Sequence, residues 1–270
     1  MELKLVTNTA RSAVLELTES GKFYTELQYD IYVNGEKYME SNKVITSLFD
    51  LKPDTDYNVY AVYNGQKTNE VNIHTKYEFV TLNVRDFGAL GDGVHDDTNA
   101  IQCAIMACPK DSRVLVPEGE YKVSSVFLKS DLTLELAKGA VLSAFTERDK
   151  FPILPGVIES YDEKEEYNLG SWEGNPLDCF SAILCGINAE NVVITGEGTI
   201  DGNTTFENWW NNCKIRNTAW RPRLFFINHC NNIMMHGITV QNSPSWTIHP
   251  YFSNHLKFID VKIKNPANSH

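Results

Sequence analysis

The sequence predicts an all-β protein in two parts. Residues 1–78 form a small β-sandwich, and residues 79–270 form the N-terminal coils of a right-handed parallel β-helix with one capping helix. Short runs rich in β-branched and aromatic residues crowd the first part. A turn-rich stretch and an amphipathic helix open the second part, and short apolar strands then recur at a roughly constant interval.

Composition limits the class of protein. The 270 residues are 42% hydrophobic and 22% charged, as in soluble globular proteins. No apolar run is long enough to span a bilayer, and the first residues lack the apolar segment of a secretory signal, so we expect a cytoplasmic protein without membrane contact. A net charge of −11 disfavours nucleic acid as a partner but allows a local basic pocket for an anion. The six cysteines form no C-x-x-C pair or zinc-spaced cluster, so we expect neither metal nor cofactor.

Seven short runs at close spacing predict the sandwich. They are residues 3–6, 13–17, 23–24, 27–33, 43–46, 57–63 and 70–75. Asn34-Gly35 and Asn64-Gly65 have the composition of hairpin turns. The segment Leu51–Tyr57 resembles the L-x-P-x-T-x-Y corner of fibronectin type III domains, in which the tyrosine bonds back to nearby backbone. A module of this kind is expected to act as a spacer or docking element.

The stretch Asn83–Gln102 opens the second part. Residues 83–87 are expected to form a short strand, and three glycines within residues 88–93 give a loop that tolerates positive φ. Asp96 or Asp97 can N-cap the helix that follows. We interpret these aspartates as a helix cap, and not as a metal site or a catalytic pair. The stretch is therefore expected to close the N-terminal end of the β-helix.

A repeat follows, in which a polar residue precedes an alternating apolar strand and a second short strand comes after it. The polar residues are Asp131, Asn191, Asn232 and His255, and the last two lie 255 − 232 = 23 residues apart. One such unit cannot bury both faces of its strands, whereas stacked units can. This pattern, with no intervening helices, predicts a parallel β-helix.

Two aromatic-rich insertions interrupt the repeat, at about residues 148–178 and 203–223. Insertions between the coils of a rigid solenoid commonly build binding surfaces. Their tryptophans are Trp172, Trp209, Trp210 and Trp220. These residues are candidates for an aromatic wall, with ordinary packing as the alternative. The acidic run at residues 162–166 is expected to be a solvated loop.

Four stretches of the second part resemble the polygalacturonases, the pectin-degrading enzymes of glycoside hydrolase family 28. They are Asn83–Ile105, Ile194–Gly202 (I-x-G-x-G-x-I-D-G), Arg221–Phe226 (R-P-x-L) and Asn242–Pro250 (N-S-P-x-W). Each motif is weak singly, but their order and spacing are specific, and the resemblance covers about residues 81–270. The leading sandwich resembles that of the exo-acting bacterial members.

The resemblance implies inverting hydrolysis of α-1,4 bonds between galacturonic acids, with an oligogalacturonate or related acidic glycan as partner. One aspartic acid would protonate the leaving oxygen and others would activate a water, across about 6.5–9.5 Å. The family's N-T-D, G-H-G and R-I-K segments are absent, and the only adjacent aspartates, Asp96-Asp97, belong to the helix cap and not to the family's D-D segment. We therefore assign no catalytic residue within this chain and interpret it as truncated before its catalytic motifs. We expect it to be inactive by itself, and an uncovered last coil would favour self-association.

Substrate-binding positions are still predicted. Trp246 and His249 lie on the last well-formed coil, where Trp246 would stack on a sugar face and His249 would bond a hydroxyl or carboxylate. Arg221 and Arg223 would hold a substrate carboxylate. Trp172 completes the set of candidate substrate-binding residues. The alternatives are burial inside the solenoid for Trp246 and His249, and surface ion pairs for the two arginines.

Two other functions stay open. The β-helix and sandwich would form a non-catalytic module that holds a glycan or a partner protein. Alternatively, the chain would be a β-helical lyase. Lyases of this kind usually use calcium and an arginine base, and the sequence shows no carboxylate cluster for calcium.

Overall fold

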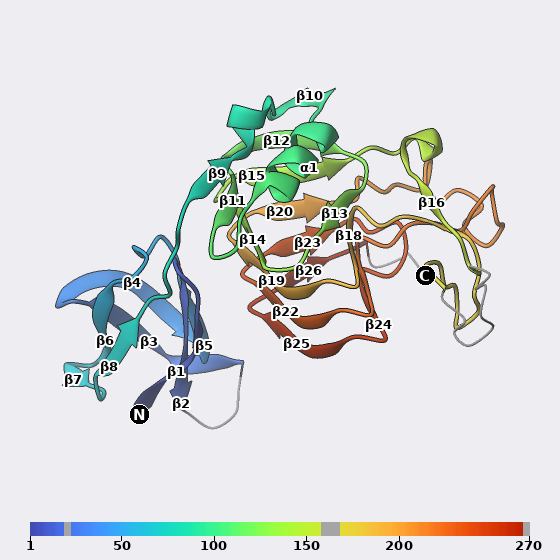
Figure 1. Ribbon diagram of the computed structural model, residues 1–270. Helices are drawn as coiled ribbons and strands as arrows, with labels where there is room; N and C mark the ends of the chain where they lie inside the picture. The colour runs from blue at the N-terminus through green and yellow to red at the C-terminus, as the bar shows by residue number, and fades with distance from the viewer. Residues whose placement is uncertain (19–22, 158–167, 267–270) are drawn as a thin grey trace. The chain divides into compact units, whose positions relative to one another are not determined.

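The computed structural model describes residues 1–18, 23–157 and 168–266 (Figure 1). Contacts between residues divide the chain into two compact units, Met1–Phe79 and Val80–His270. Strands are the dominant regular element of both units. No helix within the described ranges is long and apolar enough to cross a bilayer.

The first unit consists of two antiparallel sheets. One sheet has the order β1 (Glu2–Asn8), β2 (Ala13–Thr18), β5 (Ile45–Leu48). The other has the order β4 (Glu36–Lys43), β3 (Tyr24–Val33), β6 (Asp56–Tyr63), β7 (Gln66–Lys67), and β8 (Val71–His74) also pairs with β6. Leu15 of the first sheet and Ile31 and Val59 of the second share one buried core, as in a β-sandwich.

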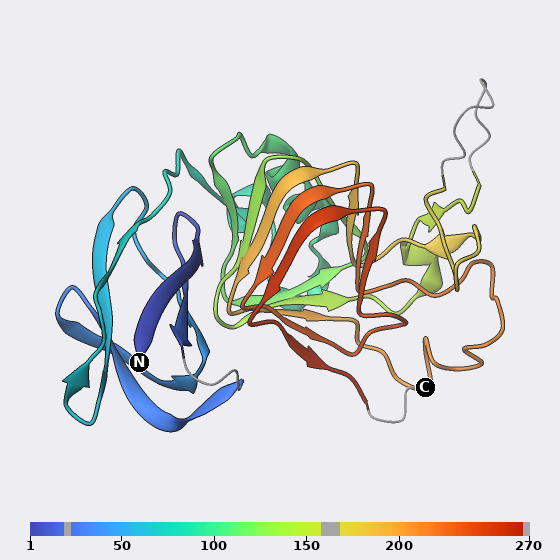
Figure 2. The ribbon, with the colours of Figure 1, turned by 90° about the horizontal axis from the view of Figure 1, so that it is seen from below.

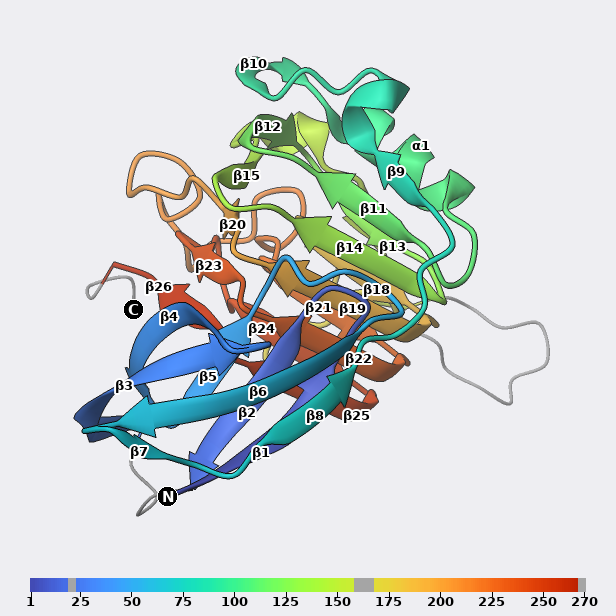
Figure 3. The same ribbon diagram turned by 90° about the vertical axis from the view of Figure 1, so that its left-hand side faces the viewer.

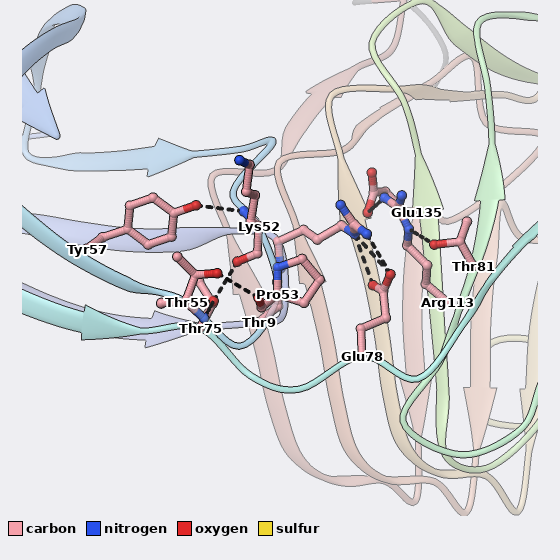
Figure 4. A network of polar contacts seen from close by, with 11 residues as sticks. Thr9, Lys52, Pro53, Thr55, Tyr57, Thr75, Glu78, Thr81, Arg113 and Glu135 are labelled. Atoms are coloured by element: carbon pink, nitrogen blue, oxygen red, sulfur yellow. Dashed lines mark hydrogen bonds and ion pairs between the residues drawn. The ribbon is translucent and has the colours of Figure 1, made fainter. Parts of the chain in front are cut away.

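Local signals place the turns of the first unit. Asn34-Gly35 and Asn64-Gly65 have positive φ at both residues, +50° and +84° in the first and +47° and +74° in the second, as two-residue hairpins require. The first turn joins β3 to β4, a largely exposed polar strand that the sequence analysis did not predict. The hydroxyl of Tyr57 accepts a hydrogen bond from the Lys52 N–H at 2.8 Å, the contact expected of the tyrosine corner (Figure 4). Membership of the fibronectin type III family stays a prediction.

The second unit is a parallel β-helix of three sheets whose coils stack one behind another (Figure 2). The first sheet contains β9 (Thr81–Asn83), β11 (Arg113–Val116), β14 (Leu132–Leu136), β19 (Glu190–Gly196), β22 (Asn231–His236) and β25 (Asn254–Ile259). The second contains β10 (Asp92–Asp96), β12 (Gly119–Val123), β15 (Ala140–Ala144), β20 (Thr199–Asp201), β23 (Thr239–Gln241) and β26 (Lys262–Lys264). The third contains β13 (Val126–Leu128), β18 (Leu184–Ile187), β21 (Phe225–Asn228) and β24 (Ile248–Tyr251).

Register explains how the coils bury their apolar residues. In the first sheet, whose strands lie side by side in Figure 3, Leu134 pairs with Ile194 and Ile194 with Met235. All three side chains are fully buried. Because each coil repeats the same inward position, stacking builds one continuous core. The predicted all-β fold, a sandwich followed by a parallel β-helix, is confirmed.

The polar residues that precede the repeated strands are corners of the coils. Asp131, Asn191, Asn232 and His255 have φ of +55°, +57°, +56° and +53°. Asn and Asp enter this left-handed region more readily than most residues. The side chain of Asn232 donates to Asn191 at 2.8 Å, and that of Asn191 donates to Asp131 at 3.0 Å. The sequence pattern thus marks a stack of turns.

The capping helix α1 (Thr98–Ala107) meets the free edge of the third sheet. The side-chain amide of Gln102 donates to the carbonyl of Phe127 in β13 at 2.9 Å and accepts from its N–H at 2.7 Å. These two bonds replace a neighbouring strand. Asp96 accepts from the Thr98 N–H at 3.0 Å, so it satisfies one amide of the first turn.

Two segments of the opening stretch differ from their prediction, and only one of the two candidate cap residues bonds an amide of the helix. Residues 84–87 form a 3₁₀ helix, η1 (Val84–Phe87), after the short strand β9. Asp97 precedes α1 but makes no side-chain cap bond; its carboxylate accepts instead from the N–H groups of Leu90 and Gly91. Residues 92–96, which include Gly93 of the predicted loop, form the strand β10, because they pair with β12 of the next coil.

Candidate functional site

Both insertions leave the β-helix between its second and third sheets. The first joins β15 to β18 and includes η2 (Arg148–Lys150) and the short antiparallel pair β16 (Ile153–Leu154) and β17 (Cys179–Phe180). The second joins β20 to β21. Since the coils stack, the insertions emerge on the same side of the β-helix (Figure 1). There they border a groove of about 1000 Å³, whose lining side chains come from within residues 172–177, 210–221, 243–248 and 263–266.

Hydrogen bonds fasten the two insertions to each other. The Trp220 N–H donates to the Asp178 carbonyl at 2.9 Å, and the Phe180 N–H donates to the Trp220 carbonyl at 2.8 Å. The guanidinium of Arg216 lies 3.3 Å from the Asp178 carboxylate. The walls of the groove are therefore linked by backbone as well as side-chain contacts, which favours a preformed site.

Three of the four insertion tryptophans border the groove. Trp172 and Trp220 stack with ring centroids 4.7 Å apart and planes 9° apart. Trp210 donates its indole N–H to the Ser243 carbonyl at 3.2 Å. Trp209 is different, because it is 1% exposed and belongs to the β-helix core. The ordinary-packing alternative therefore describes Trp209, and not its neighbour Trp210.

Arg221 lies between two aromatic rings of the groove wall. The central carbon of its guanidinium is 4.3 Å from the Trp210 ring centre and 5.3 Å from that of Trp172. Its Nη1 donates to the Pro244 carbonyl at 2.6 Å, while its Nε has no hydrogen-bond partner. Arg221 is 9% exposed, and burial lowers the pKa of its guanidinium.

Arg223 lies behind the groove surface. It is 4% exposed and does not line the groove. Its Nη1 donates to the Cys179 sulfur at 3.2 Å and its Nη2 to the Ser171 carbonyl. Burial lowers the pKa of this guanidinium as well. Over the described ranges, no carboxylate lies within ion-pair distance of Arg221 or Arg223, so the expected surface ion pairs are wrong.

Trp246 and His249 form an edge-to-face pair, with ring centroids 4.7 Å apart. Trp246 is 52% exposed and lines the groove, so it is not the buried filler of the alternative. His249 stands beside it without lining the groove, and its Nδ1 is buried without a partner. Burial, and secondarily the charge of Arg223, lowers the pKa of His249 to about 4, so the ring is neutral at pH 7.

The structure thus gathers the five predicted residues around one groove, with Trp172, Arg221 and Trp246 at its surface and Arg223 and His249 behind it. Sequence reasoning missed Lys214 and Asn265, two polar lining residues. Lys214 could have been suspected from its place in the second insertion, whereas Asn265 carried no signal. The acidic run at residues 162–166 lies outside the described residues.

The groove has aromatic and basic side chains that can bind a glycan, but its described lining lacks the pair of carboxyl groups that hydrolysis needs. Glu173 is the only carboxylic acid among its described lining residues. Inverting hydrolysis of a glycosidic bond needs two carboxyl groups about 6.5–9.5 Å apart. In the part of the chain that the structure describes, no group of three or more His, Cys, Asp or Glu residues is arranged to hold a metal ion.

Comparison with known proteins places the second unit. Residues 81–140 match the family described as "Rhamnogalacturonase A/epimerase, pectate lyase-like". A Vitis vinifera protein named "Probable polygalacturonase" is 31% identical over 193 residues, which cover 68% of this chain and 37% of that protein. The "Exo-poly-alpha-D-galacturonosidase" of Dickeya chrysanthemi is 36% identical over 165 residues, covering 57% of this chain and 25% of that protein.

Two solved structures share the fold. The family 28 exopolygalacturonase of Yersinia enterocolitica covers 97% of this chain and 59% of its own, with a TM-score of 0.65 and 20% identity. A hyperthermoactive exopolygalacturonase of Thermotoga maritima covers 70% and 48%, with a TM-score of 0.56 and 23% identity. The matched part of the chain spans 37% of the Vitis relative and 25% of the Dickeya relative. Its sequence relatives and its fold together show that it is a polygalacturonase-like protein.

Proposed function

We propose that the chain is part of a glycoside hydrolase that acts on galacturonan, and that the groove holds the acidic glycan. One observation supports this proposal above the others. Arg221 is almost wholly removed from water at the groove wall, between two tryptophans, with no carboxylate partner in the described ranges. A buried cation without a counter-charge is costly, and an incoming carboxylate would relieve that cost.

The groove offers the two contacts that a uronic acid needs. Arg221 lines the groove, and a charge-assisted hydrogen bond from its guanidinium to a carboxylate is worth about 1.5–3 kcal/mol. The half-exposed ring of Trp246 supplies a flat apolar surface for the face of a sugar. The Vitis and Dickeya relatives, by their names a polygalacturonase and an exo-acting galacturonosidase, agree with this substrate class.

Binding and cleavage are separate parts of the proposal. Inverting, exo-acting hydrolysis of α-1,4-galacturonide bonds is proposed for a protein that carries the family's N-T-D segment as well. For these 270 residues we propose binding without turnover, because the sequence lacks the family's catalytic segments and the described groove lining holds one carboxyl group. The second candidate function is that of a non-catalytic glycan-binding module. It is favoured by the same observation, because one carboxyl group in the described groove lining is fewer than hydrolysis needs.

Calorimetric titration of trigalacturonate, with galactotriose as its neutral counterpart, tests the proposal. We expect millimolar or tighter binding of trigalacturonate, weaker binding of galactotriose and no release of reducing sugar. Arg221→Met should lose most of the preference for the charged glycan. Lys138→Met, which removes an exposed charge between β14 and β15, should keep it. Absence of binding, or equal affinity for both glycans, would overturn the proposed site.

Self-association is the last part of the proposal. Phe258 of β25 and Ile263 of β26 are 36% and 57% exposed in the last described strands of their sheets. Strand edges with exposed apolar side chains invite pairing. Light scattering on the 270-residue chain should show a concentration-dependent mass, and a constant monomer mass would contradict this part.

A further inference from the structure

We propose that Arg223 is a positioning residue, which holds the groove tryptophans Trp172 and Trp246 in place and does not itself meet the glycan. The sequence predicts the same role for Arg221 and Arg223, that of binding a carboxylate. The tests of this inference that measure glycan affinity rest on the proposed function. A further test measures a spectroscopic change in the ligand-free protein and does not depend on glycan binding.

The contacts of Arg223 join three segments that are far apart in the sequence. Arg223 itself lies at the end of the second insertion. Its guanidinium bonds Cys179 and Ser171 of the first insertion, and its central carbon lies 4.9 Å from the Trp172 ring centre. The same carbon lies 5.7 Å from the ring of Trp246, which comes from the segment between β23 and β24. One side chain therefore contacts two of the tryptophans that line the groove, and these two come from segments far apart in the sequence.

The chemistry of these partners gives the contacts a geometric role. Burial raises the pKa of the Cys179 thiol, so this partner is neutral at pH 7. Among the described residues, the buried charge of Arg223 is therefore stabilised by a thiol, a carbonyl and two aromatic faces, and not by a carboxylate. A cation attracts an aromatic ring only over its face and at short distance. Rotating either tryptophan would remove a partner from a buried cation, so the charge stabilises the ring positions.

Their relation to the groove lining separates the two arginines. Arg221 is a lining residue and 9% exposed, whereas Arg223 is 4% exposed and is absent from the groove lining. The Nε of each is buried without a partner, so this atom does not distinguish them. Loss of Arg221 should therefore remove a charge that the glycan meets. Loss of Arg223 should loosen rings that any glycan meets, whether it is charged or neutral.

Affinities of Arg223→Met and Arg221→Met for trigalacturonate and galactotriose, measured at several salt concentrations, test this difference. For Arg223→Met we expect affinity for both glycans to fall by a similar factor, about tenfold, with the salt dependence unchanged. For Arg221→Met we expect a loss confined to trigalacturonate and a flatter salt dependence. A loss confined to trigalacturonate in Arg223→Met would overturn the inference, because it would place Arg223 in contact with the carboxylate.

Arg223→Lys is the conservative variant. It keeps the charge but loses the planar fork that reaches Cys179 and Ser171, so we expect it to behave like Arg223→Met. Full recovery of affinity by lysine would show that charge alone matters and would overturn the inference. If Arg223→Met fails to fold, Cys179→Ala is the alternative variant, because it removes one buried acceptor of Arg223. It should lower the affinity for trigalacturonate and for galactotriose by a similar factor.

Circular dichroism of the ligand-free protein separates this inference from the proposed function. The stacked pair Trp172 and Trp220 should give an exciton-coupled tryptophan band. Arg223→Met should weaken this band while urea unfolding still shows a folded protein. If no glycan binds to any variant, the proposed function fails and the band still decides the role of Arg223. An unchanged band in a folded Arg223→Met protein would overturn the inference.

Discussion

Protonation of one buried histidine should cost the β-helix stability in mild acid. His236 of β22 has none of its surface exposed, and burial lowers its pKa from 6.5 to about 4. As the pH falls, the unfolded chain binds this proton before the folded chain does. The contribution of the neutral His236 ring to the free energy of unfolding is therefore complete above pH 6.5 and is lost as the pH falls from 6.5 to 4. The pKa of His236 differs by 6.5 − 4 = 2.5 between the unfolded and the folded chain. At about 1.36 kcal/mol for each pKa unit, the free energy of unfolding should fall by about 3 kcal/mol by pH 4.

Urea unfolding followed by tryptophan fluorescence measures this loss in the second unit alone, because all five tryptophans lie between residues 172 and 246. We expect the free energy of unfolding to change less between pH 7 and pH 4 in His236→Gln than in the wild type, by about 3 kcal/mol. Thr195→Val removes the hydroxyl that lies 3.3 Å from His236 Nδ1 and keeps the histidine, so it should retain the full change. An equal change in His236→Gln and the wild type would refute the reasoning.

Three further substitutions test the site and the fold. Trp246→Ala should weaken trigalacturonate binding in calorimetry by about 1–2 kcal/mol, because the ring is half exposed at the groove; unchanged affinity would exclude this ring as a contact. Gln102→Leu should lower the free energy of unfolding by about 1–3 kcal/mol, because it leaves the Phe127 N–H and carbonyl without partners at a sheet edge; an unaltered urea midpoint would argue against edge capping. Tyr57→Phe should speed hydrogen exchange at the Lys52 amide and cost the first unit about 1 kcal/mol; an unchanged exchange rate would show that the bond is unimportant.

The repetitive features of the fold were predictable because each is written locally in the sequence. A polar residue such as Asn191 or Asn232 marks a left-handed corner, and the alternating apolar residues after it mark an inward-facing strand. Asn34-Gly35 likewise specifies its hairpin without reference to the rest of the chain. The strand β10 was missed because its glycine and two aspartates have low strand propensity, and pairing with the neighbouring coil overrides that preference.

The candidate site was predictable only in part. The insertions and their tryptophans were visible as interruptions of the repeat, but an irregular loop has no period that tells which side chain is buried. Trp209 and Trp210 are therefore neighbours in the sequence that point to different environments, one in the core and one at the groove. The place of Arg223 behind the groove depends on Cys179 and Trp246, which belong to other segments, so no local pattern could reveal it.

A crystal structure of the 270-residue chain with trigalacturonate would show where the glycan binds. We expect an uncleaved glycan in the groove, with a carboxylate at hydrogen-bond distance from the Arg221 guanidinium and a sugar ring packed on Trp246. Arg223 should remain behind the rings and contact no glycan atom. A glycan bound elsewhere, or a groove that stays empty at saturating trigalacturonate, would contradict the account.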